Sequence, residues 1–232
     1  MSGVLISIAG LALVALCLVG LGFLISSIRE VEERATRFAA LQLAAMLIQL
    51  LAVGYVLTFV FETENPIVIV AVVAIMIGAA SWIALRPLAG RDIRLYLVTL
   101  AALGGNGLVM LLIVTQLVLD LSRAFEPRFV VPLAGMIFSN AMNTVSLAAE
   151  RFESERAREE SYESARRIAL EAALIPQVNA LFAVGLVSLP GMMTGQIRSG
   201  IDPLIAARYQ IMVMCMTFGS AGLGAASYLI LV

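Results

Sequence analysis

The sequence contains no lysine and no histidine, so all fifteen of its basic residues are arginine. Without a lysine, the chain has no standard P-loop for ATP and no amine that could form a Schiff base. Without a histidine, it has no imidazole general base and no histidine-ligated zinc site. These absences remove several catalytic and cofactor-binding mechanisms from this chain.

Charged residues are also few. They make up 13% of the chain, whereas hydrophobic residues make up 61% and the mean hydropathy is +1.00. Soluble domains carry about 25% charged residues. The composition therefore predicts an all-α, polytopic helical membrane protein whose surroundings are the lipid bilayer. The chain has room for about seven transmembrane helices in one domain, 1–232, and for no soluble domain. The net charge of −1 gives no indication of nucleic-acid binding, and we expect none.

Cysteine is scarce too. Cys17 and Cys215 lie in apolar runs and form no CxxC motif, so each is expected to be a buried free thiol. Neither indicates a redox compartment. The apolar N-terminus lacks the basic lead of a cleaved signal peptide, so we expect it to be a retained first span.

Seven apolar runs are long enough to cross a membrane. The predicted spans are 3–28, 41–61, 67–85, 95–119, 129–149, 172–193 and 203–232. The fourth contains Gly104-Gly105-Asn106-Gly107, for which close helix packing or local unwinding is favoured over a nucleotide loop. Between the fifth and sixth spans, residues 150–171 are rich in Glu and Arg, with pairs such as Glu155–Arg158 and Glu163–Arg167. This spacing predicts one charged helix in water.

Arginine is distributed unequally between the predicted loops. With the N-terminus outside, the inner loops hold eleven arginines and the outer loops hold four: Arg123, Arg128, Arg198 and Arg208. This distribution follows the positive-inside rule. We therefore predict a multi-pass protein with its N-terminus outside, its C-terminus in the cytoplasm and the charged segment 150–171 in the cytoplasm.

The stretch 183–210 interrupts the helical pattern with several prolines and glycines, among them Pro190, Gly191 and Pro203. A backbone break at membrane depth must face protein or water, and interrupted helices in transporters often line the substrate route. The alternative interpretation is a proline-kinked helix end followed by an ordinary turn.

Polar and sulfur-containing side chains inside the spans are further candidates. Asn140 and Asn143 lie one turn apart in the fifth span and could contact a solute or bond another helix. Thioethers suit soft metals such as Cu(I), although flexible apolar packing is the commoner role of methionine. The methionines in this part of the chain are Met136, Met142, Met192, Met193, Met212, Met214 and Met216. No carboxylate lies mid-span, which counts against a proton-coupled carrier.

Four segments carry a resemblance to a known family. Residues 132–143 (PLAGMIFSNAMN), 171–177 (EAALIPQ), 184–196 (VGLVSLPGMMTGQ) and 200–214 (GIDPLIAARYQIMVM) resemble the FetB-type permeases, which include the plant aluminium-sensitivity permeases. The resemblance covers nearly the whole chain. It implies a half-size ABC transporter membrane subunit that works as a homodimer with a separate ATP-binding subunit. That subunit would bind and hydrolyse ATP-Mg, so we expect this chain to bind no cofactor and to have no enzyme activity of its own. It also implies export of a metal ion such as iron across the bacterial plasma (inner) membrane.

The resemblance also gives the candidate residues, although it assigns no metal ligand. Candidates for the substrate path are Met136, Asn140, Asn143, Pro190, Gly191, Met192, Met193, Thr194 and Gln196. The charged segment could dock the ATP-binding subunit, through Glu153, Glu155, Arg156, Arg158, Glu163, Arg166 and Arg167.

One departure from the family concerns this docking segment. Family members carry a leucine-rich stretch ending in Leu-Gly-Ala, whereas this chain continues directly into IALEAALIP. Either the shortened segment still docks the ATPase or the protein couples differently. The alternatives are a channel or carrier for a metal or small polar solute that needs no ATPase, and a membrane scaffold that transports nothing.

Overall fold

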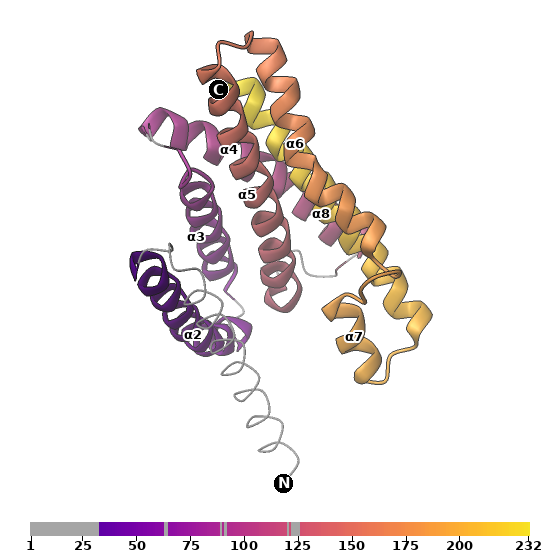
Figure 1. Ribbon diagram of the computed structural model, residues 1–232. Coiled ribbons are helices and arrows are strands. Elements are labelled where there is room, and N and C mark those ends of the chain that lie inside the picture. The colour runs from indigo at the N-terminus through magenta and orange to yellow at the C-terminus, as the bar shows by residue number, and fades with distance from the viewer. Residues whose placement is uncertain (1–32, 63–64, 89, 91, 120, 122–125) are drawn as a thin grey trace. The chain divides into compact units, whose positions relative to one another are not determined.

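The computed structural model describes residues 33–62, 65–88, 90, 92–119, 121 and 126–232, and they are predominantly helical (Figure 1). The elements are α2 (Glu33–Glu62), α3 (Pro66–Ala84), α4 (Ile93–Leu112), the π-helical turn η1 (Ile113–Val118), α5 (Pro127–Ala157), α6 (Tyr162–Ala183), α7 (Gly191–Arg198) and α8 (Pro203–Leu231). The chain divides into two compact units, Met1–Phe59 and Val60–Val232. The first predicted span, 3–28, and Cys17 lie outside the described residues.

Five helical segments of the described chain are long and apolar enough to cross a membrane, which confirms the polytopic helical class. They are Leu43–Glu62, Pro66–Ala84, Ile93–Val118, Pro127–Ala157 and Pro203–Leu231, and they match five of the predicted spans. The sixth predicted span, 172–193, is wrong in its bounds. Its helix, α6, begins ten residues earlier, within the charged segment, and ends at Ala183.

Short polar residues set the starts of three membrane helices. The Asn65 side chain accepts a hydrogen bond from the Ile67 backbone N–H at 2.9 Å, and Asp92 accepts one from Leu95 at 2.7 Å. Asp202 does the same for Leu204 at 2.8 Å. Such N-caps satisfy backbone N–H groups that the first helical turn leaves without a partner.

Helices α4, α5 and α8 pack together through small residues. A Cβ atom on Gly107 would overlap the ring of Phe138 in α5, so only glycine fits there. The Asn106 amide donates hydrogen bonds to the Ala102 carbonyl at 2.8 Å and to Ser227 Oγ of α8 at 2.9 Å. Because α4 stays helical through residues 104–107, close packing is confirmed and unwinding is not observed.

The charged segment 150–171 is not one helix, as predicted, but the adjoining ends of two. Helix α5 runs on to Ala157, the chain turns, and α6 begins at Tyr162 (Figure 1). Glu159 adopts a positive φ of 65° in this turn, and Ser161 caps α6 by accepting from the Ser164 N–H at 3.2 Å. Residues 150–171 therefore form a helical hairpin, called here the α5–α6 hairpin.

The break predicted over 183–210 is confirmed, because α6 ends at Ala183 and the chain leaves the helix at Val184. Gly185 has a φ of 81°, and its N–H donates to the Ser188 carbonyl at 3.0 Å. The short helix α7 follows, and Gly200, with a φ of 89°, leads into α8. Met192 and Met193 consequently belong to α7 rather than to the end of the sixth span.

Candidate functional site

A cavity of about 310 Å³ lies between the first half of α5, helix α7 and the first half of α8. The residues of its wall that bear on its chemistry are Arg128, Met136, Met192, Gln196, Tyr209 and Met212. We call it the α5–α7–α8 cavity. Its volume is near the lower end of the range for small-ligand sites, and its mostly apolar wall with a few polar groups is typical of them.

Three of the predicted path residues meet in this cavity. Met136 comes from α5, and Met192 and Gln196 come from α7, where their spacing of four residues places them on one helical face. Gln196 Oε1 is buried and has no hydrogen-bond partner among the described residues. The Gln196 side chain therefore adds an uncharged polar group to the wall of the cavity, beside the thioethers.

The other predicted residues of the break shape α7 and do not line the cavity. Pro190 is the N-cap of α7, and the Thr194 hydroxyl donates to the Pro190 carbonyl at 3.0 Å. Gly191 begins the helix, and Met193 is half-buried elsewhere on it. These residues position Met192 and Gln196.

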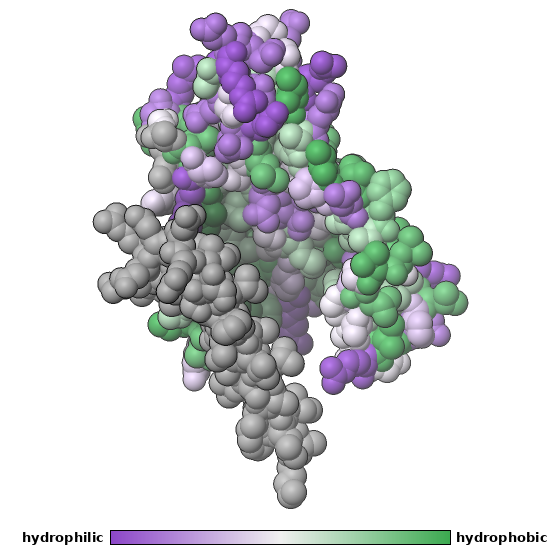
Figure 2. Space-filling view, in the orientation of Figure 1, coloured by the Kyte–Doolittle hydropathy of each residue, from purple (hydrophilic) through white to green (hydrophobic). Residues whose placement is uncertain are grey.

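The two asparagines of α5 have different surroundings. The Asn140 amide donates to the Met136 carbonyl in its own helix at 3.0 Å, whereas Asn143 is exposed. Asn143 shares its side of α5 with Pro132, Ser139 and Glu150, which are also exposed. We call these four residues the open face of α5. Pro132 also lines the α5–α7–α8 cavity, so the open face begins there, and hydrophilic side chains are visible over the middle of α5 (Figure 2).

Hydrogen bonds between helices involve polar residues that the sequence interpretation did not select. Gln177 Nε2 of α6 donates to Thr144 Oγ1 of α5 at 3.1 Å. Gln177 lies in the segment EAALIPQ and Thr144 directly follows Asn143. Each of the two helices carries a polar residue on the side that faces the other, and this was the signal that could have predicted the bond.

The α5–α6 hairpin is held together at its turn by charge and aromatic contacts. Glu155 is buried and pairs through Oε1 with Arg151 at 2.6 Å and with Arg158 at 3.4 Å, which confirms the predicted Glu155–Arg158 pair. The Arg156 guanidinium donates to the Glu160 carbonyl at 2.6 Å. These contacts make the end of the hairpin a defined structure.

Aromatic residues add to this structure. The rings of Phe152 and Tyr162 meet edge to face, 5.4 Å apart, and the Arg156 and Arg166 guanidinium groups lie 6.0 and 5.6 Å from the Tyr162 ring centre. Stacked cations and rings of this kind hold long arginine side chains in place.

The remaining docking candidates lie along the hairpin. Glu163, Arg166 and Arg167 line a groove of about 340 Å³ between α6 and the last turns of α8, while Glu153 is exposed on α5. The predicted pair Glu163–Arg167 forms no ion pair in the part of the chain that the structure describes.

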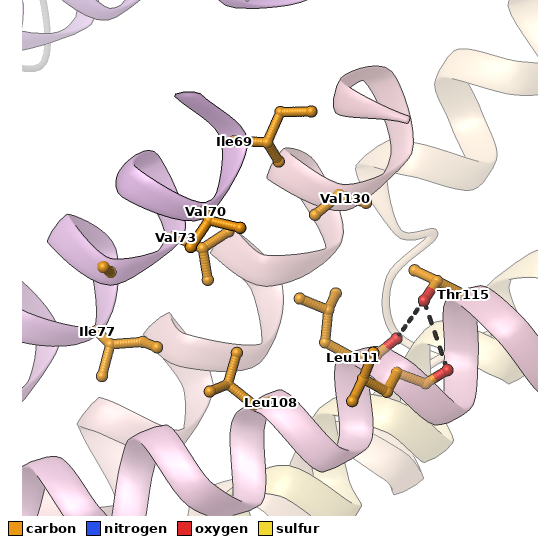
Figure 3. Close-up of a pocket in the computed structure, with 10 residues that line it drawn as sticks. Ile69, Val70, Val73, Ile77, Leu108, Leu111, Thr115 and Val130 are labelled. Atoms are coloured by element: carbon orange, nitrogen blue, oxygen red, sulfur yellow. Dashed lines mark hydrogen bonds between the residues drawn. The ribbon is translucent and has the colours of Figure 1, made fainter. Parts of the chain in front are cut away.

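A second cavity, of about 230 Å³, lies between α3, α4, η1 and the start of α5 (Figure 3). Its wall includes Ile69, Val73, Leu108 and Leu111. The Thr115 hydroxyl donates to the Leu111 carbonyl at 2.8 Å and to the Leu112 carbonyl at 3.4 Å, so its hydrogen is already used within the helix. This cavity suits an apolar chain and offers little to a polar solute.

Ordinary metal-binding clusters are absent from the described residues, where no three His, Cys, Asp or Glu side chains come together. Cys215, expected to be buried, is instead a free thiol exposed on α8. Its neighbour Met216 takes the buried position, with 2% of its surface exposed.

Comparison with known proteins gives consistent matches. The profile of the uncharacterised protein family UPF0014 matches residues 10–232. The chain is 37% identical to the UPF0014 membrane protein slr1647 of Synechocystis sp., over 72% of this chain and 71% of that protein. It is 35% identical to the probable iron export permease protein FetB of Escherichia coli, over 76% and 73% of the two chains. It is 31% identical to the protein ALUMINUM SENSITIVE 3 of Arabidopsis thaliana, over 75% and 68%. No solved structure matches the chain.

Proposed function

Because the chain belongs to the UPF0014 family of membrane proteins, we propose that it is the membrane-spanning permease subunit of an ABC-type exporter. A separate ATP-binding subunit powers transport and binds ATP-Mg, and the substrate is a metal ion such as iron. The name of the Escherichia coli relative, a probable iron export permease, supports this proposal. The family match also confirms the resemblance seen in the sequence motifs.

The observation that carries the proposal is the continuity of α5. This single 31-residue helix lines the α5–α7–α8 cavity near its start, presents its open face in the middle and forms half of the α5–α6 hairpin at its end. Pro132 inside α5 is a point where the helix can bend, but Met136 of the cavity lies on the hairpin side of it. A displacement of the hairpin by a partner therefore reaches the cavity through Met136. Docking and transport are thereby joined in one element.

The hairpin suits the docking of a cytoplasmic ATP-binding subunit. Its turn is held by the contacts of Phe152 and Arg156 with Tyr162. Glu153, Glu163 and Arg167 are exposed and available to a partner. In this arrangement the hairpin and the C-terminus face the cytoplasm of the bacterial plasma (inner) membrane, and the N-terminus lies outside. The α5–α7–α8 cavity then lies toward the outer surface.

The open face of α5 supports a homodimer. Ser139 and Asn143 are exposed in the middle of a membrane helix, where polar side chains are costly unless they face protein or water. A second copy of the chain would enclose this face and form the other half of a polar path. Asparagine both donates and accepts hydrogen bonds, so the same residue can pair with itself across a two-fold axis.

The test is co-expression of the chain with its candidate ATP-binding subunit, followed by purification in nanodiscs and an ATPase assay over a panel of metal ions. We expect a stable complex whose ATP turnover rises with one metal. The variant Glu153→Gln/Glu163→Gln/Arg167→Gln changes exposed hairpin residues that make no ion pair in the described structure, and should lose that stimulation. Arg198→Gln, an exposed charge on α7, is the control and should keep it.

Two results would contradict the proposal. If the chain forms no complex under any nucleotide condition but passes metal ions in vesicles, it is a channel or carrier that needs no ATPase. If it passes nothing, yet the hairpin still binds a cytoplasmic protein, it is a scaffold. If the hairpin variant transports metal ions as fast as the parent protein, these hairpin residues do not dock the ATP-binding subunit, and the rest of the proposal stands.

A further inference from the structure

Three methionines from three different helices meet at one cavity. Met136 of α5, Met192 of α7 and Met212 of α8 all line the α5–α7–α8 cavity and are half-buried. Other half-buried methionines, such as Met142 and Met214, do not line it. Apolar packing is the ordinary role of methionine, but thioethers that three helices bring to one cavity are also a set of sulfur ligands.

The polar groups of the cavity suit a cation that does not need carboxylates. The polar side chains of its wall are the uncharged Gln196 and Tyr209, apart from Arg128 at its edge. Among the residues that the structure describes, no Asp, Glu, His or Cys lines the cavity. Hard ions such as Mg²⁺ and Ca²⁺ require several oxygen ligands, whereas thioether sulfur selects soft ions such as Cu(I).

The charge at the edge of the cavity limits the charge of the ion. Arg128 lines the cavity from the exposed first turn of α5 and makes no ion pair in the described part of the chain. Coulomb repulsion grows in proportion to the charge of the ion. A trivalent cation is therefore opposed about three times as strongly as a monovalent one at the same distance.

We propose that the α5–α7–α8 cavity binds a soft monovalent cation of the Cu(I) class through the sulfur atoms of Met136, Met192 and Met212. The ion enters and leaves in the same oxidation state, so no electron transfer is required. The inference deepens the proposed function by naming the substrate class, and it rests on that function for the step from binding to transport.

The test measures metal binding by the purified full-length chain in nanodiscs. Ag⁺ serves as an oxidation-resistant probe, and Cu⁺ is added under a reductant that does not bind it. Cys17→Ser and Cys215→Ser are present in every protein, because the exposed thiol of Cys215 would also bind these ions. Bound metal is counted by mass spectrometry after desalting, and X-ray absorption reports whether sulfur coordinates it.

We expect one Ag⁺ per chain with sulfur ligands. Met136→Leu/Met192→Leu/Met212→Leu should weaken binding by more than about tenfold, since even outer-shell partners of a metal contribute that much. The matched control, Met76→Leu/Met142→Leu/Met214→Leu, changes three half-buried methionines that do not line this cavity and should bind normally. Equal binding by both variants, or no Ag⁺ binding by the parent protein, would overturn the inference.

Transport measurements separate this inference from the proposed function. If Ag⁺ binds through the cavity methionines but ATP does not move it in vesicles with the ATPase, the site stands and the exporter proposal falls. If ATP-driven iron export is unchanged in the cavity variant, the exporter stands and the soft-cation site is not its substrate site.

Discussion

Two regions of the unit Val60–Val232 use glycine in opposite ways. Where α4 meets α5, glycine permits close contact, because a Cβ on Gly107 would overlap the Phe138 ring. Residues 184–202 include α7. A Cβ atom added there to Gly185, Gly191, Gly195 or Gly200 would have no neighbouring atom within 4 Å. There glycine serves backbone conformation, since Gly185 and Gly200 have positive φ angles.

This difference shows how a membrane protein can combine a fixed scaffold with an adaptable site. Small residues let helices approach closely where lipid provides no hydrophobic driving force. Around α7 the same residue type allows the chain to turn twice and to bring Met192 and Gln196 to the cavity. Substitutions in the packed region should therefore affect global stability, and those around α7 should have local effects.

The largest effect is expected at the packed glycine. Gly107→Ala forces a methyl group into the Phe138 ring and should reduce the free energy of unfolding by about 1–3 kcal/mol, as overpacking usually does. Gly105→Ala is the matched control, because nothing lies near its added Cβ and alanine favours a helix over glycine by roughly 0.5–1 kcal/mol. Denaturant unfolding in mixed micelles measures both. Equal stability of the two variants would show that α4 and α5 are not so closely packed.

A smaller and local effect is expected at the second turn of the α7 region. Gly200→Ala places a side chain at a φ of 89° and should cost about 1–2 kcal/mol of strain. Hydrogen exchange should accelerate at the start of α8 while the unfolding midpoint changes little, because the region can open by itself. Gly195→Ala, within α7 and at an open position, should leave exchange unchanged. A loss of global stability as large as that of Gly107→Ala would abolish the contrast between the regions.

The smallest effect concerns the hydrogen bond across the packed region. Ser227→Ala removes one of two acceptors of the Asn106 amide and should cost about 0.6 kcal/mol, the average for such bonds between membrane helices. Ser139→Ala on the open face of α5 removes only a bond to its own helix and should cost less. The same unfolding assay compares the free energies of unfolding of the two variants. A larger loss for Ser139→Ala than for Ser227→Ala would mean that the open face of α5 is better packed than the contact between α4 and α8.

Hydropathy was sufficient to predict most of the membrane helices. The apolar runs gave the starts of α3, α4 and α8 to within two residues, and the structure shows that Asn65, Asp92 and Asp202 cap these three helices. The turn of the α5–α6 hairpin was missed because Glu and Arg favour helices throughout residues 150–171. The only local indication was Ser161, a good N-cap in the middle of the charged run.

The site was predicted in part. Met136 was selected from the segment 132–143, and Met192 and Gln196 from the segment 184–196. Their meeting depends on how α7 packs, which no local pattern encodes. Met212 was noted only as a methionine, and Arg128 only as an outer-loop charge. Tyr209 and Met212 lie three residues apart on α8, and this spacing was the signal that could have linked them.

The position of one residue in the wall of the α5–α7–α8 cavity, Leu119, depends on the number of residues in the π-helical turn η1. In this turn the Leu119 N–H donates to the carbonyl of Val114, five residues earlier, instead of four as in an α-helix. An α-helix advances by about 100° per residue, so removing one residue from η1 would rotate Leu119 by roughly that angle. Leu119 would then leave the wall of the α5–α7–α8 cavity, which it now lines. A single-codon deletion within 113–118 would therefore reshape the cavity while leaving Met136, Met192 and Met212 in its wall unchanged.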